Sequence, residues 1–401
     1  MTGSVSIPLA AMAGSAAAVL QMAGALKTAG PFAALPVDLT LLSLAALLPL
    51  LALLLVTRRW DVAPLLAVPI AAAALLWLWL VMAGAWSSSR LVLAQKLPEL
   101  VLAGPAMLAA GLLVGAEPVA RRALCQASLG IGLVLACLIL AGIPGGDPAM
   151  LVESARVHHQ LAGLALAMAA SLAALALVEA RHPLARLGWL AALLALAMAA
   201  LLPGGRTALA ALLLGCVLAP ALRLRGTAGL TWLLAGLALL AAGAAWLALN
   251  PAWIEGLRTL ERLTAEPAGL EARQDLWAAA LRWGGLAAPW GLGTGGFTIA
   301  AGHGEWRGLY PHNHALEALA EGGLPGLLLW CGAFGGAALA LLRLAPQVAP
   351  ARLARIAALV LPVALTILVS TDLGNRMAWF ALGLALSLGV TVYPARHRAD
   401  V

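Results

Sequence analysis

The segment from Pro311 to Glu317 brings two histidines, an asparagine and a carboxylate to the start of a long apolar stretch. In a chain that is 63% hydrophobic and 10% charged, polar side chains beside lipid are rare and usually functional. A neutral imidazole accepts a proton near neutral pH, so His312 is a candidate general base, with Asn313 and His314 as supporting residues. The segment therefore predicts a reaction on a polar group that is carried by a lipid.

Pro311 also suits the first position of a helix. In that helix His314, Glu317 and Glu321 share one face, whereas His312 points elsewhere. These three side chains could hold a metal ion, but no further helix offers an obvious set of partner ligands. Histidines that cap or pack at an interface are the other interpretation. We expect neither a metal nor a cofactor.

Two arginines lie where they could hold an anion. Arg206 follows a Pro-Gly-Gly turn at the start of an apolar helix, where free amides, the helix dipole and a guanidinium together suit a phosphate. Arg273 shares a helix face with Trp277 and could reach the same anion. The alternatives are an Arg206 that extends to the lipid interface and an Arg273 paired with Glu271 or Asp275.

Three more side chains could extend this site. Arg156 and His158 lie in a shorter external loop, 143–159, where a histidine at the interface is the other reading. Arg376 either joins the anion site or pairs with Asp372, and we prefer the pair.

Apolar runs of span length recur along the chain, whose mean hydropathy is +0.98. Runs of about 20 residues match the bilayer and predict an all-α polytopic membrane protein with about 12 transmembrane helices. The approximate spans are 5–25, 37–56, 62–84, 97–116, 123–143, 158–178, 187–203, 207–222, 227–249, 313–342, 352–371 and 376–393. The first span lacks the features of a cleaved signal peptide, so we expect it to be retained.

Basic residues gather in alternate loops, as in Arg58/Arg59, Arg121/Arg122 and Arg396/Arg398. By the positive-inside rule these loops and both termini are cytoplasmic. The net charge of +7 therefore reports topology and not nucleic-acid binding.

The longest external loop runs from about 250 to 312 and contains helix-like stretches. A loop of this length inside a compact protein is usually functional, and we expect a helical cap between spans nine and ten. Its glycines, Gly291, Gly293, Gly295 and Gly296, lack the strand–helix context of a dinucleotide site and predict tight turns. The expected parts are transmembrane helices 1–9 in 1–249, the periplasmic loop domain in 250–312, and helices 10–12 with a cytoplasmic tail in 313–401.

Two nucleotide signatures are absent from the sequence. No phosphate-binding loop of the GxxxxGK[ST] type occurs, so direct use of ATP is not indicated. No Asp-x-Asp pair is present to hold Mg²⁺ for a nucleotide sugar. The energy for any transfer reaction must come from elsewhere.

Several stretches, in this order, resemble the O-antigen ligase/polymerase family of bacterial inner membranes. They are Gly205-Arg206-Thr207-Ala208, Arg273-Gln274-Asp275-Leu276-Trp277, the glycine string 291–297, and His312-Asn313-His314-Ala315-Leu316-Glu317 followed by 321–326. The resemblance covers residues 190–342, and the N-terminal half agrees only in hydropathy. Ala315 departs from the family, which often has an aromatic residue there.

The resemblance implies an O-antigen ligase that transfers a glycan from undecaprenyl diphosphate to the lipid A-core oligosaccharide. This would take place at the periplasmic face of the Gram-negative inner membrane, without metal and with inversion. Arg206 and Arg273 would hold the diphosphate, and His312 would deprotonate the acceptor hydroxyl.

Two other functions remain open at this stage. A polymerase of the same family would join repeat units, but polymerases often have two sizeable external loops, and loop 143–159 is small. A transporter of lipid-linked glycans would carry charged residues and broken helices at mid-membrane. The predicted spans are nearly free of charge at their centres, which argues against a transporter.

Overall fold

The computed structural model describes residues 6–33, 35–141, 158–254, 257–265 and 268–394. Within these ranges eleven helices are long and apolar enough to cross a membrane, and a further apolar helix, Arg376–Gly389, is shorter. The predicted all-α polytopic fold is therefore confirmed, and the protein is a multi-pass membrane protein.

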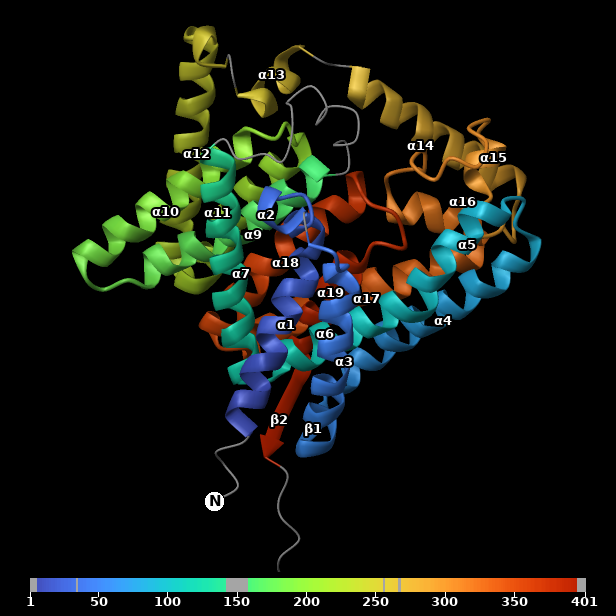
Figure 1. Cartoon of the computed structure of the whole chain (residues 1–401), viewed down its shortest axis with the longest axis horizontal. Helices are drawn as coiled ribbons and strands as arrows, with labels where there is room; N and C mark the ends of the chain where they lie inside the picture. The colour runs from blue at the N-terminus through green and yellow to red at the C-terminus, as the bar shows by residue number, and fades with distance from the viewer. Residues whose placement is uncertain (1–5, 34, 142–157, 255–256, 266–267, 395–401) are drawn as a thin grey trace, which may run out of the picture.

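Short connections join most helices of the first half (Figure 1). These helices are α1 (Ser6–Leu26), α2 (Gly30–Ala33), α3 (Leu39–Thr57), α4 (Ala67–Ala83), α5 (Arg90–Pro98), α6 (Gly104–Ala116), α7 (Pro118–Leu140), α9 (His158–Glu179), α10 (Pro183–Leu201), α11 (Arg206–Leu224) and α12 (Gly226–Leu249). The 3-10 turns η1 (Pro64–Leu66) and η2 (Gly84–Trp86) flank α4. The π turn η3 (Glu99–Ala103) joins α5 and α6 into one span, Arg90–Ala116.

The segment after α12 forms a helical cap at one end of the bundle, as the sequence predicted (Figure 1). It contains η4 (Pro251–Ile254), α13 (Arg258–Ala265), α14 (Ala268–Leu286) and α15 (Phe297–Ala300). The chain then returns through α16 (His314–Trp330), η5 (Cys331–Gly335), α17 (Gly336–Leu344), η6 (Ala345–Gln347), α18 (Pro350–Val369), α19 (Arg376–Leu386) and η7 (Ser387–Gly389). The cap thus lies between the ninth and tenth spans and leads directly into α16.

A small antiparallel sheet was not predicted. Strand β1 (Arg58–Val62) follows α3 and pairs with β2 (Val390–Pro394), with Val62 opposite Val390. The last span was predicted to run to residue 393, but α19 ends at Leu386. Valine and aromatic residues favour extended backbone, and here two short segments far apart in sequence satisfy each other's backbone groups.

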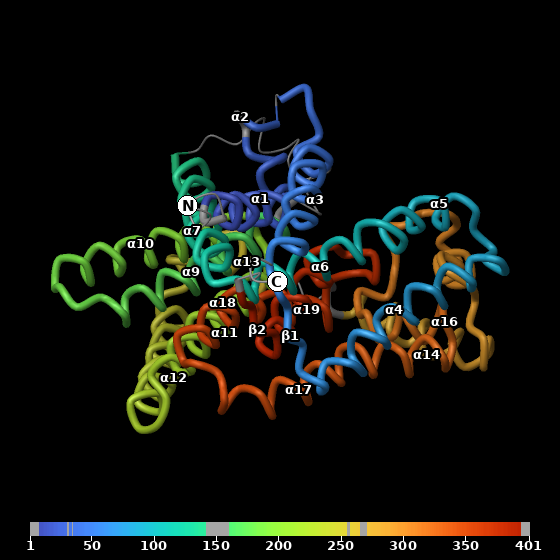
Figure 2. The backbone as a smooth tube through the Cα atoms, turned by 90° about the horizontal axis from the view of Figure 1, so that it is seen from below, coloured from blue at the N-terminus to red at the C-terminus, as the bar shows by residue number. Residues whose placement is uncertain are grey.

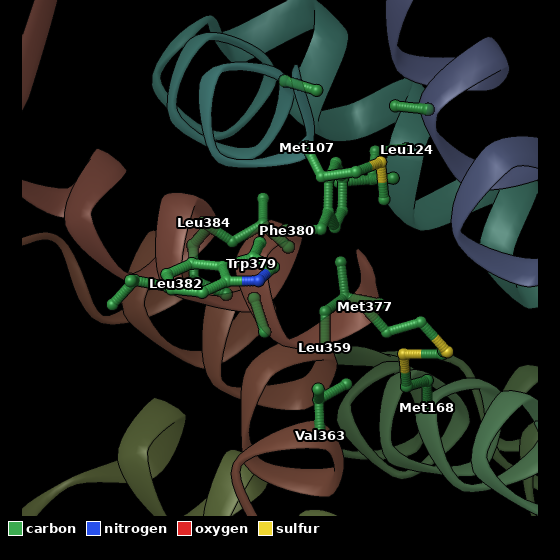
Figure 3. Close-up of a cluster of buried hydrophobic side chains, with 14 of the residues drawn as sticks. Met107, Leu124, Met168, Leu359, Val363, Met377, Trp379, Phe380, Leu382 and Leu384 are labelled. Atoms are coloured by element: carbon green, nitrogen blue, oxygen red, sulfur yellow. The ribbon is translucent and has the colours of Figure 1, made fainter. Parts of the chain in front are cut away.

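The core lies where α6, α18 and α19 meet α7 and α9, and Figure 3 shows part of it, including Trp379 and Phe380. Glycines let α6 and α19 approach closely: a Cβ on Gly111 would lie 2.2 Å from the carbonyl oxygen of Phe380. Trp379, fully buried, donates its indole N–H to the carbonyl of Leu373 at 2.8 Å. The core therefore also fixes the loop that precedes α19.

Helices α4, α5, α14 and α16 form a lobe on one side of this centre (Figure 2). Within the lobe α16 packs against α4 and α14. The helix bends at Gly323, whose φ of 66° is left-handed. The start of α16 contacts three parts of the molecule: the cap, α5, and the loop that precedes α19.

Candidate functional site

His312 lies at the junction of the cap and α16 in a strained backbone conformation. Its φ is 54°, in the left-handed region that residues other than glycine rarely adopt, and such strain gathers at functional sites. Asn313 is the N-cap of α16, and its side chain accepts the N–H of Leu316 at 3.0 Å. The helix therefore begins at His314 and not at Pro311, which corrects the predicted start. The left-handed turn at His312 directs the chain into the cap position.

The imidazole of His312 is half-buried and stacks on Tyr310, with ring centroids 4.0 Å apart. Its buried Nδ1 has no hydrogen-bond partner in the described structure. Burial and the nearby charge of Arg273 lower the pKa of His312 to about 4, although a hydrogen bond with the backbone of Ser370 and the charge of Asp372 act in the opposite direction. The ring is therefore neutral at pH 7, which is the form that accepts a proton.

Arg206 is the first residue of α11 and follows the N-cap Gly205, as predicted. The cap helix α13 packs over this helix end. Arg262 donates to the carbonyl of Gly204 at 2.9 Å, and the N–H of Gly204 donates to Thr259 at 3.1 Å. Arg206 in turn donates to the backbone carbonyl of Arg262 at 3.4 Å. The Gly-Gly turn thus ties the cap to the bundle and brings two arginines together.

Arg273 is half-buried on α14. Burial lowers the pKa of its guanidinium, and the charges of Arg206 and Arg262 lower it further. Among the ion pairs of the described residues, none joins Arg273 to the acidic neighbours considered in the sequence analysis, Glu271 and Asp275. The charges of Arg206 on α11 and Arg262 on α13 thus act on Arg273 of α14, and the charge of Arg273 acts in turn on His312.

The other predicted residues divide into three groups. His314 is fully buried, with its Nε2 3.0 Å from Thr371 Oγ1 and its ring edge-on to Phe334, so it packs in the interior. Asn313, besides capping α16, donates to the carbonyl of Leu368 at 2.8 Å. Arg156 lies outside the described residues, and His158 is the first residue of α9.

The predicted pair between Arg376 and Asp372 is wrong. Asp372 accepts instead from Arg307 at 2.8 Å, because Arg307 reaches from the cap loop to this carboxylate and to that of Glu99. Arg376 begins α19 and lies against α1, where a Cβ on Gly24 would be 3.4 Å from its Nη2. Its Nε is buried and has no hydrogen-bond partner among the described residues.

Glu317 and Glu321 do share a buried face, but their partner is a lysine. Lys96 Nζ lies 2.5 Å from Glu317 Oε1 and 2.8 Å from Glu321 Oε1. The carboxylates thus have an ammonium group as partner, and His314, which was expected on the same face, is hydrogen-bonded to Thr371. In the part of the chain that the structure describes, no three His, Cys, Asp or Glu side chains gather as metal ligands. Lys96 lies within the span Arg90–Ala116 because this span begins at Arg90, earlier than the predicted start at residue 97.

Sequence reasoning missed Tyr310, Arg262 and Lys96. The chain has 2 tyrosines, and one of them stands two residues before His312. Lys27 and Lys96 are its only lysines, and Lys96 interrupts a long apolar stretch. These compositional signals were available. The partners could not be predicted, because pairing across 58 residues for Arg262, 60 for Tyr310 and 221 for Lys96 leaves no local pattern.

Comparison with known families gives one match. The family model described as O-antigen ligase matches residues 190–331. No curated protein matches the chain significantly. The matched stretch runs from α10 to η5 and includes Arg206, Arg273 and His312. Over residues 190–331, about a third of its length, the chain is similar to the O-antigen ligase family.

Proposed function

We propose that the protein is an O-antigen ligase, a glycosyltransferase that moves a glycan from undecaprenyl diphosphate to the lipid A-core oligosaccharide. The family match supports ligase- or polymerase-type chemistry in general. The observation that carries the proposal is the accumulation of arginine charge from α11, α13 and α14 beside a neutral, partly unpartnered His312. The site would face the periplasm of the inner membrane, with both termini in the cytoplasm.

The donor's diphosphate is both the anion to be bound and the leaving group. Arg206 and Arg273 would hold its oxygens, and Arg262 would add to the positive field. Charge-assisted hydrogen bonds contribute roughly 1.5–3 kcal/mol each. These contacts would strengthen as the anomeric C–O bond breaks and negative charge grows on the leaving oxygen. The chain's own cations would thus stabilise the leaving group.

His312 would act as the general base. Its imidazole would take the proton of the acceptor hydroxyl while that oxygen attacks the anomeric carbon. The new C–O bond forms as the bond to the diphosphate breaks, so the configuration inverts. The proton remains on the imidazole, and the electron pair of the broken bond leaves on the diphosphate. Asn313 would hold His312 in place by capping α16.

The test is reconstitution of the purified protein with lipid-linked glycan and lipid A-core, followed by a gel shift of the acceptor. His312→Ala should lower transfer by ~10²–10⁴-fold and leave donor binding in place. His303→Ala changes another histidine of the cap loop and serves as the matched control, with transfer near that of the parent protein.

Three outcomes would contradict the proposal. Full transfer by His312→Ala would remove this residue as the base. Elongation of the lipid-linked glycan without transfer to lipid A-core would identify a polymerase of the same family. Accumulation of donor across the vesicle membrane without any transfer would identify a transporter.

A further inference from the structure

A buried charged triad lies within the membrane-spanning part of the protein, away from the arginines of the proposed anion site. Lys96 of α5 contacts Glu317 and Glu321 of α16, and the side chains of all three are at most 4% exposed. Burying charged groups in such surroundings lowers stability unless the groups pair. Even when they pair, apolar residues of similar volume often stabilise a protein equally well. A role other than stability should therefore explain them.

The two carboxylates differ in what they reach. Glu321 places both of its oxygens 2.8 Å from Lys96 Nζ. Glu317 gives one oxygen to Lys96 and accepts the backbone N–H of Leu373 at 2.8 Å with the other. Only Glu317 thus extends the triad to the loop between α18 and α19, residues 370–375, which we call the α18–α19 loop.

The α18–α19 loop is joined at successive residues to the segment that carries His312. Tyr310 donates to the carbonyl of Ser370 at 2.9 Å, and Thr371 is hydrogen-bonded to the ring of His314. Arg307 contacts Asp372, and Glu317 accepts from Leu373. The partners of the loop lie on both sides of His312 in the sequence, which would keep the strained turn at His312 in one conformation.

Lys96 determines whether Glu317 can hold the loop. A buried carboxylate needs a donor for each of its oxygens, and Lys96 supplies the donor for Oε1 while the backbone of Leu373 supplies the one for Oε2. The ammonium group also fixes the Glu317 side chain from the side opposite Leu373. The π turn η3 begins three residues after Lys96, and such turns inside helices are frequent at functional sites.

We propose that Lys96 is a positioning residue for His312: through Glu317 it holds the α18–α19 loop against the segment that carries the imidazole. This inference rests on the proposed function for its catalytic consequence. The structural consequence, order in the α18–α19 loop, does not depend on which reaction the site performs. The two can therefore be tested separately.

The first experiment compares Glu317→Ala with Glu321→Ala by amide hydrogen exchange of residues 370–375 in the full-length protein. Both substitutions remove the same atoms from one face of one helix, and both take a carboxylate from Lys96. If the triad positions the loop, exchange should accelerate about tenfold or more in Glu317→Ala and much less in Glu321→Ala. Equal acceleration in both variants would show that the triad only stabilises the fold and would overturn the proposal.

The second experiment measures transfer kinetics. In Lys96→Met, kcat should fall about 100-fold, as expected for a misplaced catalytic group, while KM for the donor changes less than about threefold. Lys96→Arg keeps a cation and should recover part of the lost kcat. Lys27→Met removes the other lysine, which pairs with Asp38 in a partly exposed position, and serves as the control.

The readouts separate the possible failures. A rise in donor KM with unchanged kcat in Lys96→Met would overturn the positioning role. Absence of transfer in the parent protein would defeat the proposed function, and loop exchange would still test the triad. If Lys96→Met does not fold, the comparison of the two glutamate variants remains decisive.

Discussion

At the scale of single residues, the basicity of His312 is governed by its burial and by charges on two different elements. Burial and the positive charge of Arg273 on α14 lower its pKa to about 4, and Asp372 before α19 opposes them. A bound diphosphate would offset the charge of Arg273. The pKa of His312 should therefore rise when the donor binds.

The difference in the pKa of His312 between the free protein and the donor complex predicts two pH profiles. Protonation removes the base, so activity is lost as the pH falls through the pKa of His312. The acid limb of kcat/KM, which reports the free protein, should lie near pH 4, and the acid limb of kcat, which reports the complex, at higher pH. Steady-state kinetics between pH 3.5 and 8 would check this, within the pH range where the protein stays folded. An acid limb of kcat at or below that of kcat/KM would contradict the account.

Arg273→Gln should change two quantities at once. Loss of one charge-assisted contact should weaken donor binding by roughly 10- to 150-fold, which corresponds to about 1.5–3 kcal/mol. Removal of the cation should also raise the pKa of His312 and move the acid limb of kcat/KM upward.

The control for this change is Arg282→Gln on the same helix, where Arg282 is exposed and lies over the ring of Trp283. It should leave both donor binding and the acid limb in place. A shift of the limb in Arg282→Gln as large as in Arg273→Gln would show that the effect is not local to His312.

At the scale of elements, the bend of α16 joins the site to the lobe formed with α4, α5 and α14. Gly323 makes this bend with a φ of 66°, and a Cβ there would lie 2.1 Å from the carbonyl oxygen of Pro289. Both the backbone conformation and the space therefore require glycine. The cap loop and α16 can meet only because this residue has no side chain.

Gly323→Ala should lower the free energy of unfolding by about 1–3 kcal/mol, from backbone strain and the displaced Pro289 carbonyl. Gly188→Ala in α10 is the matched control, because no atom lies within 4 Å of its added Cβ and its backbone is helical. It should be neutral or should stabilise by up to about 1 kcal/mol. Thermal unfolding of both purified variants would check the difference, and equal midpoints would contradict it.

Hydropathy predicted the spans because lipid requires long apolar helices whose backbone groups are satisfied within each helix. Glycine and arginine motifs placed Arg206 at the start of α11, since helix ends have local sequence signals. The start of α5 at Arg90 was missed, because a lysine and an arginine hid the apolar pattern. The pairing of Arg307 with Asp372 was missed too, since it depends on how distant segments fold together.

At the scale of the whole molecule, the sheet of β1 and β2 and the cap lie at opposite ends of the bundle (Figure 1). With the basic loops in the cytoplasm, the cap and the site would face the other side of the membrane. The position of the cap relative to the membrane therefore decides which compartment supplies the substrates.

Cysteine labelling would check this topology. In a background with the native cysteines replaced, Leu263→Cys in the cap should react with a membrane-impermeant thiol reagent in cells whose outer membrane alone is permeable. Arg181→Cys, between α9 and α10, should react only after the inner membrane is opened. Both positions are exposed in the structure. The opposite order of labelling would show that the protein has the reverse orientation in the membrane.

The α18–α19 loop has a consequence for how the protein is made. It follows the rest of the proposed site in the chain, and α19 and β2 anchor it from its C-terminal side through Trp379 and the pairing with β1. A nascent chain that has already emerged as far as His312 still lacks the loop that orders it. Catalytic activity should therefore appear only after α19 has been synthesised and inserted into the bilayer. An incomplete translation product would contain the arginines and the histidine and would still be inactive.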